Sequence, residues 1–205
     1  MVPTATRAAP GAASAPALEV LPRDLSPYKK GNTGIDYVHR FDSGKPGPHV
    51  LINALTHGNE FCGMVAATHL LDAGVRPRVG TLTVSFANVE AYETFDAAKP
   101  FDSRQLVHNF NRIWSADWLD GAQDSPELRR ARLMRPVVAA ADHILDIHST
   151  SHGSIAFKGL VHPKRHHVLA GGMDVKNMVC RGYNRPHQAG AAQLGAVLRT
   201  IKPVG

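Results

Sequence analysis

Apolar strand-like runs and helix-like runs alternate along this chain, and that alternation limits the possible folds most. The run "HVLINAL" at residues 49–55 predicts a buried strand, and "FCGMVAATHLLDAG" predicts a helix over residues 60–73 that ends at Gly74. A run rich in β-branched residues predicts a second strand over residues 80–92, and "HILDIH" predicts a third over residues 143–148. Strands separated by helices predict an α/β fold with a mostly parallel or mixed central sheet flanked by helices.

The region between the second and third strands is less regular. Residues 93–124 are expected to form a loop, and such a long loop is unusual in a compact domain unless it has a function. Ser125 as N-cap and Pro126 at the first helical position predict the start of a helix. Pro136 is expected to kink this helix or divide it in two.

Composition and charge change toward both ends of the chain. Residues 1–25 are rich in Ala and Pro and lack the continuous apolar run of a secretory signal, which predicts a disordered leader and a cytoplasmic location. Residues 26–153 form the predicted α/β domain. Residues 154–205 contain eight Lys or Arg and one acidic residue, a net charge of +7, whereas the rest of the chain nets −1. With little periodicity and few strand candidates, this basic tail is expected to be atypical and poorly ordered.

Charge and hydropathy also argue against several classes of partner. The net charge of +6 lies entirely in the tail, which has no regular basic face, so no nucleic-acid partner is expected. No apolar run approaches the roughly 18 residues of a membrane span, so no membrane partner is expected. Cys62 and Cys180 are too few for a disulfide framework. A sheet edge left open by an incomplete C-terminal part would favour pairing of two chains, so a homo-oligomer is an open alternative.

Four metal-ligating or carboxylate side chains lie at predicted strand ends. His57 and Glu60 are three residues apart in the turn after the first strand, and His148 ends the third. Carboxyl ends of parallel strands meet at one sheet edge, so these three side chains are expected to converge there. A His, Glu, His set leaves a fourth position open, which is typical of catalytic zinc, and predicts one Zn²⁺ per chain. Asp146, on the same strand face as His148, is placed to accept a hydrogen bond from a ligand imidazole.

Four motifs occur together in a specific order. "THGNE", "SRQLVHNFNRIW", "ELRRA" and "DIHSTS" follow one another over residues 48–152. In this order and spacing the chain resembles the succinylglutamate desuccinylase and aspartoacylase family, relatives of the zinc carboxypeptidases. The resemblance implies a zinc-carboxypeptidase-like fold and a zinc ion bound by His57, Glu60 and His148.

The resemblance also implies substrate-binding residues in the segment before the second helix. Asn111 and Arg112 match the pair that grips the α-carboxylate of the substrate, and Arg104 matches an arginine that polarises the scissile carbonyl. A planar guanidinium suits bidentate capture of a carboxylate, and a cation beside the carbonyl stabilises an oxyanion as it forms. No role is assigned to His108 or Asn109, which stand where the family often has acidic residues.

The chain departs from the family pattern after the third ligand. Family members carry a general-base glutamate there, but no glutamate follows Glu127, and Asp174 is the one acidic residue after Asp146. The change of charge, the loss of strand pattern and the missing base all begin near residue 153. We therefore hypothesise that the chain is truncated or altered after about residue 153, which leaves the C-terminal part of the fold incomplete. The alternative is a genuine divergent ending with its own function.

The expected activity is zinc-dependent hydrolysis of the amide bond of an N-acyl amino acid, a deacylase reaction. For lack of the general base, this chain is expected to be weak or inactive. One alternative is a zinc carboxypeptidase that uses the same metal and the same carboxylate clamp on peptides. The other is a non-catalytic homologue that binds metal or a carboxylate ligand without turning it over.

Overall fold

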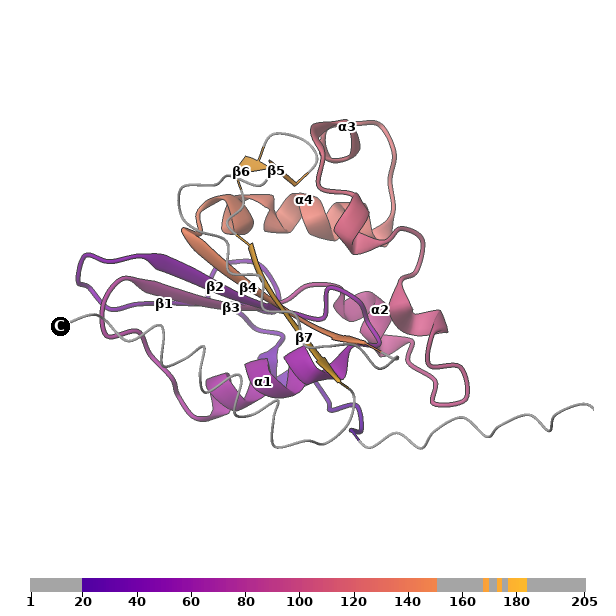
Figure 1. Ribbon diagram of the computed structural model, residues 1–205, viewed down its shortest axis with the longest axis horizontal. Coiled ribbons are helices and arrows are strands. Elements are labelled where there is room, and N and C mark those ends of the chain that lie inside the picture. Colours follow the sequence, from indigo (N-terminus) through magenta and orange to yellow (C-terminus); the bar gives the residue numbers. More distant parts are fainter. Residues whose placement is uncertain (1–19, 151–167, 170–172, 175–176, 184–205) are drawn as a thin grey trace, which may run out of the picture.

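A mixed five-stranded sheet forms the centre of the protein, so the expected α/β architecture is confirmed. The computed structural model describes residues 20–150, 168–169, 173–174 and 177–183. The sheet has the strand order β1-β3-β2-β4-β7 (Figure 1). Its strands are β1 (Val38–Asp42), β2 (His49–Ala54), β3 (Thr81–Phe86), β4 (His143–Thr150) and β7 (Asn177–Tyr183). A separate antiparallel pair consists of β5 (Val168–Leu169) and β6 (Met173–Asp174).

Strand direction places three loops at one edge of the sheet. β2 is parallel to both of its neighbours, β3 and β4, whereas β1 is antiparallel to β3. Ala54 at the end of β2 pairs with Phe86 and with Ile147. The segments that follow Ala54, Phe86 and Ile147 therefore meet at the carboxyl edge, where sites are built in open α/β sheets.

Helices cover both faces of the sheet, with α1 (Phe61–Asp72) on one face and α4 (Pro126–Ala139) on the other (Figure 1). Side chains of β2 alternate between these faces because successive residues of a strand point in opposite directions. Ile52 joins the larger core cluster, which contains residues of α1, whereas Leu51 joins a cluster with Val137 near the end of α4. The core is thus divided into two layers by the sheet.

The chain between β3 and α4 is more helical than expected. The second strand ends at Phe86 rather than at residue 92, and α2 (Val89–Glu93) follows it. This helix forms because Val89 and Tyr92, three residues apart, are buried on one of its sides. The predicted loop over residues 93–124 contains the 3₁₀ helices η2 (Asp102–Arg104) and η3 (Phe110–Arg112) and the short helix α3 (Ala116–Leu119). A further 3₁₀ helix, η1 (Ser26–Tyr28), precedes β1.

Pro136 does not divide α4, so of the two expected effects, a kink or a division, the division is wrong. The helix begins as predicted, with Ser125 Oγ accepting a hydrogen bond from Leu128 N at 3.1 Å. It then runs unbroken through Pro136 to Ala139. Proline costs a helix the hydrogen bond that its own nitrogen would donate, and here the last turn tolerates that loss.

Two boundaries differ from those expected near the ends of the domain. Residues 20–25 were assigned to the leader, yet Leu25 is buried in the core, and Arg23 N donates to Tyr92 Oη at 2.7 Å. Strand β7 lies in the tail, where few strand candidates were seen, and pairs in parallel with β4 from Ile144 onward. Its formation follows from the unpaired backbone groups that the edge of β4 offers. Residues 1–19, 151–167, 170–172, 175–176 and 184–205 lie outside the described residues.

Within the residues that the structure describes, none of the helices combines the length and the apolar character that crossing a membrane needs.

Candidate active site

A tight turn after β2 brings His57 and Glu60 to the same side of the chain. Leu55 adopts a left-handed backbone conformation with φ of 56°, which is uncommon for a residue with a bulky side chain and turns the chain sharply out of the strand. Glu60 N then donates to the carbonyl oxygen of His57 at 3.1 Å. Because Glu60 is also the N-cap of α1, the helix begins immediately after the turn.

Gly58 allows a second segment to lie directly against this turn. Its N–H donates to the carbonyl oxygen of Arg104 at 3.2 Å. A Cβ atom at this position would lie 2.3 Å from the carbonyl oxygen of Ser103 and 2.5 Å from Tyr92 N. Only glycine therefore permits the segment that carries Arg104 to approach this closely.

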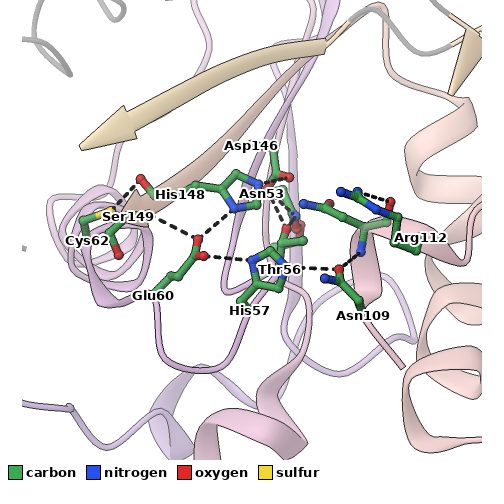
Figure 2. A network of polar contacts seen from close by, with 12 residues as sticks. Asn53, Thr56, His57, Glu60, Cys62, Asn109, Arg112, Asp146, His148 and Ser149 are labelled. Atoms are coloured by element: carbon green, nitrogen blue, oxygen red, sulfur yellow. Dashed lines mark hydrogen bonds and ion pairs between the residues drawn. The ribbon is translucent and has the colours of Figure 1, made fainter. Parts of the chain in front are cut away.

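Three side chains from distant parts of the chain converge on one point, as Figure 2 shows. Oε1 of Glu60 lies 2.8 Å from Nδ1 of His57, and Oε2 lies 2.7 Å from Nδ1 of His148. One nitrogen or oxygen atom from each of the three residues lies within 4.8 Å of the others. Their exposed fractions are 2% for His57, 5% for Glu60 and 7% for His148. The structure thus brings together the set that sequence analysis picked as zinc ligands.

The charges of this cluster are balanced by protons and hydrogen bonds. Burial raises the pKa of Glu60, but hydrogen bonds with His148 and His57 outweigh it and hold that pKa below its ordinary value. Burial lowers the pKa of His148, but the carboxylates of Asp146 and Glu60 outweigh it and raise that pKa to about 10. A buried pair of carboxylates thus holds positive charge on an imidazole, and a cation could replace that charge.

Two nitrogen donors and one carboxylate, with both Nδ1 atoms facing the same carboxylate, are the donor set of a three-ligand catalytic zinc site. The residues present therefore fit a zinc ion.

Asp146 fixes the orientation of the His148 ring by contacting its Nε2 atom, while Nδ1 faces Glu60. Its Oδ2 lies 2.7 Å from Nε2 of His148, the interaction expected from the sequence. Its Oδ1 accepts hydrogen bonds from Thr56 Oγ1 at 2.7 Å and from Asn53 Nδ2 at 2.9 Å. Oδ1 of Asn53 accepts in turn from Ser85 Oγ at 2.6 Å. The network crosses β3, β2 and β4 in register, and Nδ1 of His148 is left facing Glu60 (Figure 2).

Substitution of Asp146 should weaken metal binding. We expect Asp146→Asn to lower zinc affinity about 10- to 100-fold, because such partners hold the ring and raise its basicity. Competition with a chromogenic chelator measures this affinity. Asp142→Asn is the matched control, since Asp142 lies at the opposite end of β4, where it accepts from His49 N. Equal affinity of the Asp146 variant and the wild type would contradict this role.

Asn109, to which the sequence assigned no role, holds the other histidine. Its Oδ1 accepts from Asn111 N at 3.0 Å, which identifies this atom as the oxygen, and lies 3.2 Å from Nε2 of His57. Asn109 thus contacts the outer nitrogen of His57, while Nδ1 of the same ring faces the carboxylate of Glu60. The one signal in the sequence is the short spacing in "NFNR", which places Asn109 two residues before Asn111.

Arg104 lies at the rim of the cluster. Its NH1 donates to Oε1 of Glu60 at 2.9 Å, and its NH2 lies 3.1 Å from Nε2 of His57. Its side chain is 41% exposed, so the guanidinium faces solvent on one side and the ligand set on the other. A cation in this place can stabilise negative charge on a carbonyl oxygen beside the centre.

Asn111 and Arg112 form no hydrogen bond or ion pair with the three converging side chains. Arg112 is exposed, and its NH1 donates to the carbonyl oxygen of Asn111 at 3.2 Å. In the view of Figure 2, Arg112 lies on the far side of Asn109 from His57. Among the residues that the structure describes, no carboxylate forms an ion pair with Arg112. The positively charged guanidinium of Arg112 is therefore exposed to solvent beside the cluster.

Cys62 lies next to the cluster but behaves as a structural residue. Its Sγ donates to the carbonyl oxygen of His148 at 3.1 Å. Burial raises the pKa of its thiol to about 11. The thiol therefore stays protonated at neutral pH and is not available as a thiolate ligand.

Comparisons with known sequences and structures identify related proteins. The family model described as "Succinylglutamate desuccinylase/Aspartoacylase catalytic domain" matches residues 46–178. The match extends into the tail, past the change expected near residue 153. No curated protein matches the chain.

Solved structures share the fold. A succinylglutamate desuccinylase from Chromobacterium violaceum superposes with a TM-score of 0.61 and 16% identity, over 84% of this chain and 66% of that one. An aspartoacylase family protein from Mesorhizobium loti superposes with a TM-score of 0.52 and 19% identity, over 80% of this chain and 62% of that one. A variant of murine aminoacylase 3 superposes with a TM-score of 0.51 and 20% identity, over 77% of this chain and 63% of that one.

The chain therefore spans about two thirds or less of the length of each of these structures. Since the family model covers well over half of the 205 residues, the chain belongs to the succinylglutamate desuccinylase/aspartoacylase family of hydrolases.

Proposed function

We propose that this chain binds one zinc ion through His57, Glu60 and His148 and acts on the amide bond of N-acyl amino acids. The observation that carries the proposal is the convergence of both Nδ1 atoms on the two oxygens of one buried carboxylate. A bound zinc ion would supply Lewis acidity, which polarises a carbonyl group and makes water more acidic.

The surrounding residues prepare the ligand set for this role. Asp146 and Asn109 engage the outer nitrogens of His148 and His57, so both inner nitrogens face the centre. Little rearrangement of the rings is then needed when metal binds, because partners of this kind fix ring orientation.

Arg104 stabilises the reacting carbonyl in this proposal. When water adds to an amide carbon, negative charge develops on the carbonyl oxygen. The guanidinium of Arg104 is anchored by Glu60 and is partly exposed, so it can donate a hydrogen bond to that oxygen as the charge forms.

Arg112 provides selectivity for a free carboxylate. Its guanidinium is exposed beside the cluster, and a planar guanidinium binds a carboxylate through two parallel hydrogen bonds. The names of the similar structures point to N-succinylglutamate and N-acyl aspartate as probes, and both carry the α-carboxylate that Arg112 would hold.

Loss of Arg112 should weaken binding of these probes. We expect Arg112→Ala to reduce affinity for N-succinylglutamate about 10- to 100-fold in calorimetric titration of the zinc-loaded protein, because solvent screening at an exposed guanidinium reduces its two charge-assisted hydrogen bonds to about 1.5–3 kcal/mol together. Arg112→Lys should restore only part of the affinity, because an ammonium group cannot bind in bidentate fashion.

Two controls make this result specific. Arg78→Ala removes an exposed arginine outside the site and should leave affinity unchanged. An analogue of the probe whose α-carboxylate is converted to an amide should bind the wild type as weakly as the carboxylate binds Arg112→Ala. Tight binding of the amide analogue would refute the carboxylate clamp.

A further inference from the structure

Glu127 is a buried carboxylate outside the metal cluster, in the "ELRRA" motif to which no role has yet been given. It lies in the first turn of α4 and is 0% exposed. Its Oε1 accepts from Leu106 N at 2.6 Å and from Val107 N at 3.2 Å, and its Oε2 accepts from His108 N at 3.3 Å. Burial raises its pKa, but these backbone N–H groups outweigh it and keep that pKa below its ordinary value. The ionised carboxylate of Glu127 thus accepts hydrogen bonds from three consecutive backbone N–H groups.

The three donors lie in the middle of the segment that carries the substrate-binding residues. Arg104 precedes them, and Asn109 and Arg112 follow. Leu106 and Val107 are 39% and 56% exposed, so burial of their side chains does little to anchor the segment. The hydrogen bonds to Glu127 therefore attach the backbone at this point, beside the packing of the His108 ring against Trp118.

The helix that carries Glu127 is itself tied to the sheet. Arg130, one turn further along α4, donates from Nε to the carbonyl oxygen of Ala87 at 2.9 Å and from NH2 to that of Phe86 at 2.7 Å. Phe86 ends β3 at the carboxyl edge. The N-terminal part of α4, from Glu127 to Arg130, thus links the substrate segment to the same edge that carries the ligand set.

We propose that Glu127 is a positioning residue for substrate binding. By holding residues 106–108, it places Arg104 against Glu60 and Asn109 against His57, and it sets where Arg112 is presented. The substrate part of this inference rests on the proposed function, whereas the attachment of the segment does not.

Hydrogen exchange tests the attachment by itself. In the full chain, Glu127→Gln keeps the shape of the side chain but turns an N–H donor toward backbone donors. We expect amide exchange at Leu106, Val107 and His108 to become about tenfold faster or more, because each loses a charge-assisted partner. Unchanged exchange at these three amides would overturn the attachment.

A matched control separates this effect from a general weakening of α4. Ser125→Ala removes the N-cap of the same turn, where Ser125 Oγ accepts from Leu128 N, and leaves the carboxylate in place. It should not speed exchange at residues 106–108. Should Glu127→Gln fail to fold, Glu127→Asp keeps the charge on a shorter side chain and should give an intermediate rate, whereas a wild-type rate would refute the attachment.

Binding of N-succinylglutamate tests the positioning role. In the zinc-loaded full chain we expect Glu127→Gln to weaken this binding about 10- to 100-fold, since small displacements of positioning groups have effects of that size. Zinc stoichiometry should stay that of the wild type, because His57, Glu60 and His148 lie on other segments, and Ser125→Ala should bind the probe normally.

The outcomes are distinguishable. Faster exchange with unchanged probe binding would refute the positioning role. Absence of probe binding to the wild type would refute the proposed function and the positioning role together, and the exchange rates would still decide the attachment.

Discussion

One zinc ion per wild-type chain, and none in a His57→Ala/His148→Ala double variant, is the result we expect from metal analysis by mass spectrometry. The reason is geometric, because the three donors already lie within 4.8 Å of one another. The double variant leaves Glu60 as the single remaining ligand, whereas catalytic zinc sites use three protein ligands. The expected change is therefore a complete loss of bound metal.

Two exposed histidines provide the matched control for this experiment. His69 lies on α1, the helix that follows the His57 turn, and His143 begins β4, so a His69→Ala/His143→Ala variant removes two imidazoles without touching the cluster. This control should retain one zinc ion per chain. Zinc retained by the ligand variant, or lost from the control, would show that metal binds elsewhere.

Slow hydrolysis by this 205-residue chain, despite metal and substrate binding, is the second large effect that we expect. Loss of a general base typically reduces a rate about 10²- to 10⁴-fold. Each carboxylate in the site is already engaged. Glu60 accepts from His57, His148 and Arg104, and Asp146 contacts His148 and accepts from Thr56 and Asn53. In the described part of the site, no carboxylate is left to take a proton from water, and no glutamate follows Glu127 in the sequence.

Release of free amino acid from N-succinylglutamate measures this deficit. The zinc-loaded chain should be assayed beside murine aminoacylase 3 and beside its own His57→Ala/His148→Ala variant, which sets the background. A rate within tenfold of that reference enzyme on its own substrate would contradict the prediction and indicate that another group acts as the base.

A set of peptides in the same assay distinguishes the competing activities. A carboxypeptidase would cleave a peptide with a free C-terminus and leave both a C-terminally blocked peptide and the N-acyl amino acid intact. A deacylase would hydrolyse the N-acyl amino acid. A non-catalytic homologue would bind the probe in calorimetry and release no product from any of the three compounds.

Local sequence patterns predicted the elements that support the site. Strand β2, helix α1 and strands β3 and β4 form largely where apolar periodicity placed them, because each buries its own apolar side chains against the same core. Errors occurred where tertiary contacts outweigh local preference. Residues 89–93 are helical because Val89 and Tyr92 pack into the core, and residues 177–183 form a strand because β4 offers them an open edge.

The candidate ligands could be found from sequence because their positions follow from general rules. His57 and Glu60 are close in the chain, and His148 lies near the carboxyl end of β4, two residues before the strand ends, beside the end of its parallel neighbour β2. The remaining polar network could not be found in this way. The hydrogen-bonded pair Asn53 and Ser85 is separated by 32 residues in the sequence. The pair Asn109 and His57 is separated by 52, and no periodic pattern links the members of either pair.

The sequence by itself therefore determined the α/β architecture, the three candidate ligands and the presence of arginines near them. Only the tertiary structure decided that Asp146 and Asn109 orient the histidines, that Arg104 reaches Glu60, and that Glu127 holds the segment between the arginines. Apolar patterning is local and repeats along the chain. The partners of a buried polar group depend instead on which distant segments meet when the chain folds.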